Sequence, residues 1–326
     1  MNNQNKIELL LKRTNLNMSF DEFLKDVQSK FTSLGKINGY SPINEGYEDA
    51  NFVLNTSTGK FVLKIFLVER KLENINSYVK ILRECKDINV PTTEILTDFN
   101  EGLGFIESGE VKTYYIITRF FEGSNFQNTT PTLEDIRSVT SYISKLNTLN
   151  FPVVSEYDSW GIKNFAKEYE FKKDKLTPEQ KSLIENIYSE YIKIDMTDFS
   201  KSVIHGDMQR KHVIKNNAGD YCILDFGCMA FDEKVIELAT YLAWFCLQED
   251  TWKDKDLIYK EVLDVYNSTH HLPDYEINIL PTLIKISYSA YYMTTSVMIN
   301  EGDKSEETLD WHNRSNKMLE LSRGWK

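Results

Sequence analysis

The chain has 326 residues, of which 41% are hydrophobic and 27% charged, a composition typical of a globular protein with a sizeable core and room for two lobes. Its net charge of −11 disfavours binding to nucleic acid or to an anionic membrane surface, and it either attracts a cationic substrate or serves solubility alone. No apolar run reaches the length of a membrane span, the first residues lack the apolar core of a secretory signal, and the four cysteines form no CxxC pair, so we expect a cytoplasmic protein.

The first helix is predicted to begin after Ser19, behind a polar and Asn-rich segment, residues 1–18, that we expect to be peripheral. Ser19 and Glu22 form a capping-box pattern, in which each side chain satisfies a backbone N–H of the first turn. Apolar residues then recur on one helical face and predict that this face packs against a core: Phe20, Phe23, Leu24, Val27 and Phe31.

Between Ile37 and Phe66 the apolar spacing changes to that of strands, and turn-forming residues at 45–50 and 55–59 divide the stretch into three antiparallel strands. Lys64 lies in the last of them, with apolar residues on both sides. A lysine buried in a strand needs a charged partner or a ligand. An edge lysine that reaches solvent through its aliphatic stem is the alternative.

A helix is predicted from Glu69 to Cys85, and a β-rich run from Val111 to Phe121 ends at Glu122-Gly123. The polar residues that follow are the best candidate for a domain boundary, which divides the chain into residues 1–122 and 123–326. Beyond this boundary, apolar residues or helix-start signals predict helices in five stretches: 132–149, 177–192, 254–267, 275–299 and 305–324.

Two carboxylates and a histidine are concentrated between Val203 and Gly227. Apolar, β-leaning pieces at 201–204 and 221–224 lead to Asp207 and Asp225, and His212 lies between them, before a turn at 215–220. A hairpin would bring the three side chains together. In phosphoryl transfer one carboxylate orients the attacking hydroxyl and other ligands hold Mg²⁺ on the phosphates; Asp207 fits the first role, and His212 and Asp225 fit the second.

His205-Gly206-Asp207, a ligand position five residues beyond this aspartate, and Asp225-Phe226-Gly227 together resemble the paired signature of the aminoglycoside phosphotransferase and choline kinase superfamily. Either motif alone would arise by chance, and an aspartate at a strand end more often caps a turn. The presence of both motifs in this order, with Lys64 in a strand upstream, favours a kinase-like site. The resemblance implies an α+β, two-lobed protein kinase-like fold, with a small antiparallel β lobe for the nucleotide (1–122) and a larger helical lobe for catalysis and substrate binding (123–326).

The resemblance also implies how the nucleotide, ATP or GTP, is held. Lys64 would grip its phosphates, and Gly46 would belong to the loop that covers them. One glycine makes only a thin phosphate cradle, so a plain hairpin is the alternative for that loop. Backbone groups near Arg119, Phe120 and Phe121 would meet the purine.

Three positions depart from the residues that are usual in this superfamily. His212 stands where most members have Asn, and imidazole is an unusual ligand for Mg²⁺, although some antibiotic phosphotransferases carry His there. Tyr78 stands at the expected place of a helix glutamate that pairs with the strand lysine, so the partner of Lys64 stays unassigned. Glu237 replaces the aspartate of an Asp-Leu-Ala motif and keeps its charge.

We therefore expect a Mg²⁺-dependent kinase that transfers the γ-phosphoryl group of ATP or GTP to a hydroxyl of a small, cationic molecule, with an aminoglycoside-like antibiotic as the leading acceptor. A metabolic kinase for choline, homoserine or a sugar is an alternative of the same class. A nucleotide-binding pseudokinase or regulatory module is an alternative of another class. The acidic residues from Glu301 to Asp310 either bind amines or form a solvated helix start.

Overall fold

The computed structural model describes residues 7, 10–14, 16, 18–43, 49–108 and 111–325. Gly46, the predicted residue of the nucleotide loop, lies outside the described residues. The chain divides into two compact units, each built from two segments: Met1–Ser124 with Lys215–Leu224, and Asn125–Ile214 with Asp225–Lys326.

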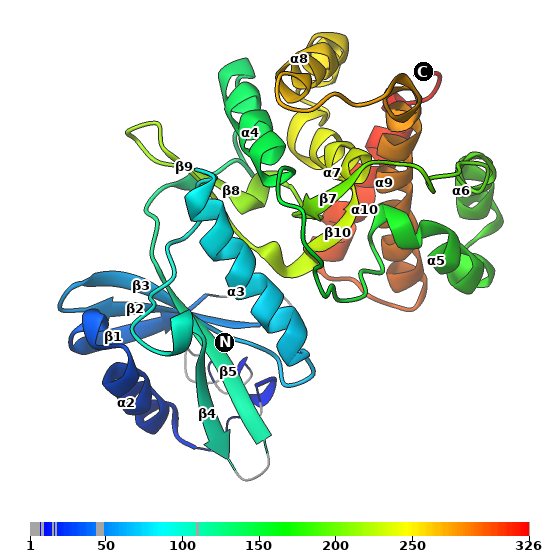
Figure 1. Ribbon diagram of the computed structural model, residues 1–326. Helices are drawn as coiled ribbons and strands as arrows, with labels where there is room; N and C mark the ends of the chain where they lie inside the picture. The colour runs from blue at the N-terminus through cyan, green and yellow to red at the C-terminus, as the bar shows by residue number, and fades with distance from the viewer. Residues whose placement is uncertain are drawn as a thin grey trace. The chain divides into compact units, whose positions relative to one another are not determined.

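A five-stranded antiparallel sheet forms the first unit, and its strand order is β1-β2-β3-β5-β4 (Figure 1). The strands are β1 (Ile37–Pro42), β2 (Ala50–Thr56), β3 (Gly59–Ile65), β4 (Gly104–Ser108) and β5 (Val111–Arg119). The three strands predicted between Ile37 and Phe66 are β1, β2 and β3. Since β3 pairs with both β2 and β5, Lys64 lies on an interior strand rather than at an edge.

Helix α2 (Phe20–Lys30) covers the core of this sheet. Ser19 and Glu22 form the predicted capping box, and the rings of Phe20 and Phe23 pack on Phe52 and Tyr115, with centroid distances of 4.5 and 5.1 Å. Helix α3 (Leu72–Asp87) also belongs to this unit, and its buried residues include Ile75, Ile81 and Leu82, which recur at helical spacing.

Part of the N-terminal segment belongs to the same core. Leu10 and Thr14 are buried, and the Thr113 hydroxyl donates a hydrogen bond to the Thr14 carbonyl at 3.2 Å. The expectation that residues 1–18 are peripheral is therefore wrong for these two residues. The apolar side chains of Ile7, Leu10 and Leu11 add to the hydrophobic core. Their burial stabilises this part of the segment although its neighbours in the sequence are polar.

The segment from Lys215 to Leu224 belongs to the first unit because it pairs with the chain that follows α3. Within it, β9 (Tyr221–Ile223) contacts that chain: the Ile223 N–H donates to the Pro91 carbonyl at 2.7 Å, and Ile223 forms a bridge with Thr92. A turn closed by Asn216 and Asp220 precedes β9, as the Asn-Asn-Ala-Gly-Asp composition predicts.

Helices make up most of the second unit. They are α4 (Leu133–Leu146), α5 (Phe165–Lys172), α6 (Pro178–Tyr191), α7 (Lys234–Tyr241), α8 (Lys255–Asn267), α9 (Asp274–Asn300) and α10 (Glu306–Leu321). Thr177 caps α6 with the side-chain bond that its sequence predicts, and Thr132 caps α4 in the same way. The long helix α9 packs against α5, α6, α7 and α10, and Figure 1 shows α10 beside it.

Two strands in the second unit position the loop that carries Asp207. Strand β7 (Lys201–Ile204) pairs antiparallel with β10 (Ala230–Glu233), so the residues that follow β7 and those that precede β10 are adjacent. The short strands β6 (Ser124–Asn125) and β8 (Val213–Lys215) lie where the segments of the two units join. Within the described residues, none of the helices combines the length and the hydropathy that crossing a bilayer requires.

Candidate active site

The loop after β7 carries Asp207, and Gly206 makes its sharp turn possible. Gly206 has a φ of +81°, and a Cβ built on it would lie 2.3 Å from the backbone oxygen of Cys228. The turn therefore accepts only glycine without rearrangement. The Asp207 N–H donates to Nδ1 of the buried His205 at 3.2 Å, and the His205 ring packs against Phe226 with a centroid distance of 4.7 Å.

Glu237 on α7 ties this loop to the helical core. Its carboxylate is fully buried and accepts a hydrogen bond from the Gly206 N–H at 2.9 Å. Burial raises the pKa of Glu237 to about 7, and the backbone hydrogen bonds that it accepts oppose this shift. The glutamate that replaces the usual aspartate thus holds the turn that precedes Asp207.

Gln209 and Tyr291 hold one oxygen of the Asp207 carboxylate. The side-chain amide of Gln209 donates to Asp207 Oδ1 and to the Tyr291 hydroxyl, the latter at 2.7 Å. The Tyr291 hydroxyl lies 3.5 Å from the same Oδ1. The nitrogen of the amide must face Asp207, since its oxygen would repel the carboxylate. The other oxygen, Asp207 Oδ2, lies 3.5 Å from Nδ1 of His212.

Neither residue was identified from the sequence. Gln209 is only 3% exposed, and its Oε1 has no hydrogen-bond partner among the described residues. An amide buried with one unsatisfied atom is costly, which indicates that its contact with Asp207 has a role beyond packing. The position of Gln209, two residues after Asp207, was the one signal in the sequence; Tyr291 lies 84 residues from Asp207, and no local pattern links them.

An aromatic cluster surrounds Tyr291. Its ring centroid lies 4.9 Å from that of Trp160, 4.4 Å from that of Trp244 and 5.0 Å from that of Trp311. The cations of Lys211 and Arg314 each lie 5.7 Å from the Trp311 ring. We refer to Trp160, Trp244, Tyr291 and Trp311 as the aromatic cluster. The pKa of the Tyr291 hydroxyl is raised well above its ordinary value, first by burial and second by the charge of Asp207.

His212 lies between the two aspartates. Its Nδ1 is 2.8 Å from the backbone oxygen of Asp207, and because a carbonyl only accepts, Nδ1 carries the proton of this bond. In a neutral ring Nε2 then presents a lone pair, and this atom lies 3.7 Å from Oδ2 of Asp225. The predicted convergence of Asp207, His212 and Asp225 is therefore observed within one unit.

The imidazole of His212 and the carboxylate of Asp225 fit a metal ion that takes its remaining ligands from phosphates and water. Asp225 adopts a left-handed conformation (φ 61°, ψ 73°), rare for a residue other than glycine, and its side chain is 48% exposed. No group of three or more His, Cys, Asp or Glu side chains in the described part of the chain could hold a metal by itself. Mg²⁺ commonly takes one or two protein ligands and completes its shell with phosphates and water, so two donors are sufficient here.

In the first unit, Lys64 has a carboxylate partner that the sequence analysis did not identify. Its ammonium lies 3.0 Å from Oδ2 of Asp49, the residue just before β2. The Lys64 side chain is 15% exposed, so the alternative of an edge lysine that reaches solvent is wrong. Tyr78, which stands at the expected glutamate position, instead faces Lys64 with its ring, 5.5 Å from the ammonium.

The backbone at the predicted purine site is already partly engaged. The Arg119 N–H donates to the Glu94 carbonyl at 2.8 Å, and the Phe120 N–H donates to the Lys60 carbonyl at 3.1 Å. The Arg119 side chain also pairs with the Glu94 carboxylate. The N–H groups of Arg119 and Phe120 thus already donate to other backbone groups of the protein. The backbone groups that remain as candidates for contact with the purine are the carbonyl groups and the Phe121 amide.

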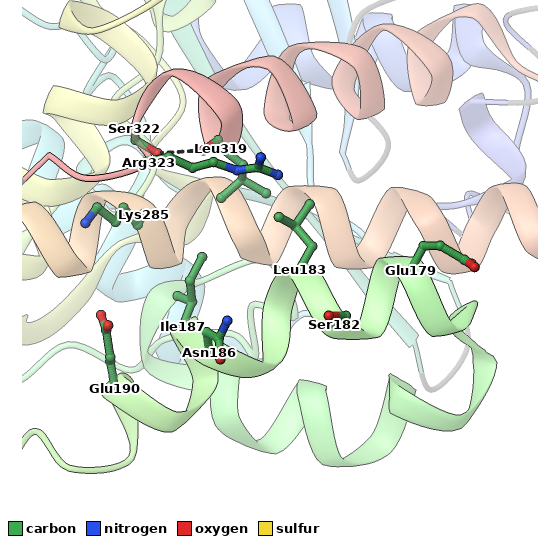
Figure 2. A pocket seen from close by; sticks show the side chains of 10 residues that line it. All are labelled: Glu179, Ser182, Leu183, Asn186, Ile187, Glu190, Lys285, Leu319, Ser322 and Arg323. Carbon is green, nitrogen blue, oxygen red and sulfur yellow. Dashed lines mark hydrogen bonds between the residues drawn. The ribbon is translucent and has the colours of Figure 1, made fainter.

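A separate pocket of about 460 Å³ lies among α6, α9 and α10. Figure 2 shows that its lining side chains come from these three helices and from Ser322 and Arg323, which directly follow α10. The helical ones include Glu179, Leu183 and Ile187 of α6, Lys285 of α9 and Leu319 of α10. Asp207, His212 and Asp225 do not line it, so the pocket is not where the predicted chemistry takes place.

Residues 39–266, more than half of the chain, match the model of a family described as "Phosphotransferase enzyme family". No curated protein matches the chain by sequence. Among solved structures, an amicoumacin kinase in complex with AMP-PNP, Ca²⁺ and its ligand is similar with a TM-score of 0.68 at 10% identity, over 93% of each chain.

Two further structures are similar over almost their whole length. A spectinomycin phosphotransferase in complex with ADP and spectinomycin has a TM-score of 0.63 at 11% identity and covers 95% of this chain and 99% of its own. A choline kinase from Streptococcus pneumoniae has a TM-score of 0.61 at 13% identity and covers 92% and 99%. The predicted α+β fold, a small antiparallel β unit with a larger helical unit, is confirmed, as is the predicted superfamily.

Proposed function

Because the chain belongs to the phosphotransferase enzyme family, and is thus a phosphotransferase with an alcohol group as acceptor, we propose that it is a Mg²⁺-dependent kinase that transfers the γ-phosphoryl group of ATP or GTP to a hydroxyl of a small cationic molecule. The observation that carries the proposal is the position of His212, which contacts the backbone of Asp207 at 2.8 Å and lies 3.7 Å from Asp225. An acceptor base and two metal donors are thus adjacent.

Asp207 is proposed as the catalytic residue. Its Oδ2 orients the acceptor hydroxyl and takes up the hydroxyl proton as the new bond from oxygen to the γ-phosphorus forms and the bond from that phosphorus to the β,γ-bridging oxygen breaks, which releases the nucleoside diphosphate. Gln209 and Tyr291 hold Oδ1, so the carboxylate presents Oδ2 in one orientation. Holding the base in place lowers the entropy cost of reaching the reactive geometry.

His212 and Asp225 are proposed to hold Mg²⁺. Held by these two side chains, Mg²⁺ would supply positive charge to the phosphates of the nucleotide. In the chain itself, the hydrogen bond from His212 Nδ1 to the Asp207 carbonyl fixes the ring orientation and directs Nε2 toward the side of Asp225.

Residues of the first unit are proposed to hold the nucleotide. Lys64 binds its phosphates, and its contact with Asp49 at 3.0 Å supports this role because the buried carboxylate orients the ammonium. Gly46 and the backbone at Arg119, Phe120 and Phe121 are proposed to contact the phosphates and the purine, respectively. For Arg119 and Phe120 the contact would use carbonyl groups, since both N–H groups are engaged.

A cationic acceptor is supported by the surroundings of Asp207. The aromatic cluster adjoins the catalytic carboxylate through Tyr291, and aromatic faces attract ammonium groups. By contrast, Glu301 pairs with Lys175, Asp310 pairs with Arg314, and Asp303 accepts bonds from the start of α10. These contacts favour a solvated helix start for the acidic residues rather than an amine site.

An aminoglycoside-like antibiotic is the leading acceptor class, and two of the similar structures are enzymes named for antibiotics. The aromatic cluster favours a second candidate, an ammonium alcohol such as choline, because a quaternary ammonium has no N–H to donate and relies on aromatic faces for recognition.

The test is mass spectrometry of an acceptor panel after incubation with the full chain, Mg²⁺ and either ATP or GTP. The panel contains amino-sugar antibiotics, choline, homoserine and simple sugars. We expect one class to gain a phosphoryl group, and Asp207→Asn to abolish this product while it leaves nucleotide affinity unchanged. Equal product with Asp207→Asn, or loss of nucleotide binding in that variant, would contradict the role of Asp207.

A further inference from the structure

Lys64 pairs with a carboxylate that directly precedes strand β2 rather than with one on helix α3. The expected helix position is occupied by Tyr78, whereas Asp49 directly precedes β2. We infer that Asp49 is the positioning residue of the proposed phosphate-binding lysine, and that it takes the place of the missing helix glutamate. The inference rests on the proposed function, in which Lys64 binds the nucleotide phosphates.

Strand register explains why Asp49 reaches Lys64. Asn51 of β2 is directly opposite Lys64 of β3. Side chains two residues apart in extended chain lie on the same face, so Asp49 is the diagonal neighbour of Lys64 on that face. The pairing of β2 and β3 therefore brings the carboxylate to within 3.0 Å of the ammonium.

The other oxygen of the Asp49 carboxylate, Oδ1, accepts hydrogen bonds that hold the carboxylate in place. Oδ1 accepts from Nε of Arg70 at 3.2 Å and from the Leu67 N–H at 3.1 Å, while Oδ2 faces Lys64. Arg70 in turn donates to Asn74 Oδ1 at 3.0 Å. The Asp49 side chain is 2% exposed and that of Arg70 is 3% exposed. A buried carboxylate with this many fixed donors acts as a rigid anchor rather than a mobile counter-ion.

The contact with Asp49 fixes the direction of the Lys64 ammonium. An ammonium has three N–H donors, and the bond to Asp49 Oδ2 at 3.0 Å orients one of them. The Tyr78 ring, 4% exposed and packed on Phe66, borders the ammonium with its face and adds a weaker attraction.

The test is the affinity of the full-length Asp49→Asn variant for Mg²⁺ with a non-hydrolysable ATP analogue, measured by isothermal titration calorimetry. We expect a loss of about tenfold or more, because a charge-assisted bond that orients the lysine is removed. Asp26→Asn is the matched control: Asp26 forms an acid–lysine pair with Lys30 at 2.7 Å in the same unit, and its loss should leave the affinity unchanged. A folded Asp49→Asn protein with wild-type affinity would overturn the inference.

A second change separates orientation of Lys64 from general damage. Tyr78→Glu in the Asp49→Asn background returns a carboxylate to the helix position that faces Lys64, and we expect it to recover part of the lost affinity. No recovery in a folded double variant counts against the inference. If Asp49→Asn does not fold, Asp49→Glu keeps the charge but displaces it by one methylene; it should weaken nucleotide binding, and unchanged affinity there would also overturn the inference.

These readouts are independent of the acceptor. A chain that binds nucleotide but phosphorylates no acceptor contradicts the proposed reaction, whereas the role of Asp49 is judged by nucleotide affinity alone. The failure of one can therefore be told from the failure of the other.

Discussion

The buried carboxylate of Glu237 accepts a hydrogen bond at 2.9 Å from the backbone N–H of Gly206, the residue directly before Asp207. The contact joins α7 to the turn that presents the proposed base. The Glu237 carboxyl group is fully buried, so its protonation is linked to the stability of the fold.

The free energy of unfolding should therefore depend on pH through Glu237. Its folded pKa of about 7 exceeds the ordinary value of 4.5, because burial disfavours the carboxylate. The stabilising contribution of the protonated form is complete below pH 4.5 and is lost as the pH rises through 7, a change of ~3 kcal/mol. Glu237→Gln removes this dependence, so its stability relative to wild type should rise between pH 5 and pH 8. Urea denaturation across that range measures the difference, and a constant difference contradicts the prediction.

Gly206→Ala should destabilise the protein and lower activity. The added Cβ would lie 2.3 Å from the backbone oxygen of Cys228, an atom that cannot move without shifting the chain after Asp225, and φ is +81°. We expect a loss of ~3 kcal/mol. Gly219→Ala is the matched control, since its φ is +91° but nothing lies within 4 Å of the new atom. It should lose about 1 kcal/mol, from backbone strain alone, and keep full activity. Thermal unfolding and turnover of both variants decide; equal effects would show that the contact with Cys228 is unimportant.

Gln209→Leu should reduce kcat by about 10- to 100-fold, because Asp207 Oδ1 loses a donor and the carboxylate is no longer held in one orientation. Tyr291→Phe should act in the same direction to a smaller extent. The KM for nucleotide should not change, as neither side chain is assigned to it. Steady-state kinetics provide the measurement.

Gln248→Leu is the control for loss of a buried amide. Gln248 is 9% exposed and donates to the Ala243 carbonyl at 2.8 Å, in the same unit but with no contact to Asp207. It should lower stability without affecting kcat. If Gln209→Leu behaves in the same way, Gln209 is structural only.

Metal preference should change when His212 is replaced by Asn. An amide oxygen suits Mg²⁺ better than imidazole does, whereas imidazole favours later transition metals such as Co²⁺. We expect His212→Asn to activate at lower Mg²⁺ concentration and at higher Co²⁺ concentration than wild type. Activity titrated with each metal gives the ratio of activation constants. An unchanged ratio would mean that His212 does not contact the metal.

Local patterns in the sequence predicted many of the elements and the core of the site, although α5 and α7 were not predicted. The start patterns at Ser19 and Thr177 predicted two helix starts, because a cap depends on residues only three apart. Asp207, His212 and Asp225 were predicted to converge for a similar reason: one loop and one turn join them, so their spacing along the chain limits their spacing in space.

Contacts between distant segments were decided by the tertiary structure alone. Tyr291 contacts Asp207, 84 residues away in the sequence, because α9 packs beside α7. Leu10 and Thr14 are buried because this part of the chain packs against the core of the sheet. Burial depends on what packs above a residue, which composition does not reveal. Asp49 is the clearest example: the sequence identified Lys64 and the absence of a helix glutamate, but the register of β2 against β3 determined which carboxylate is adjacent. A shift of one residue would have turned Asp49 to the other face of the sheet.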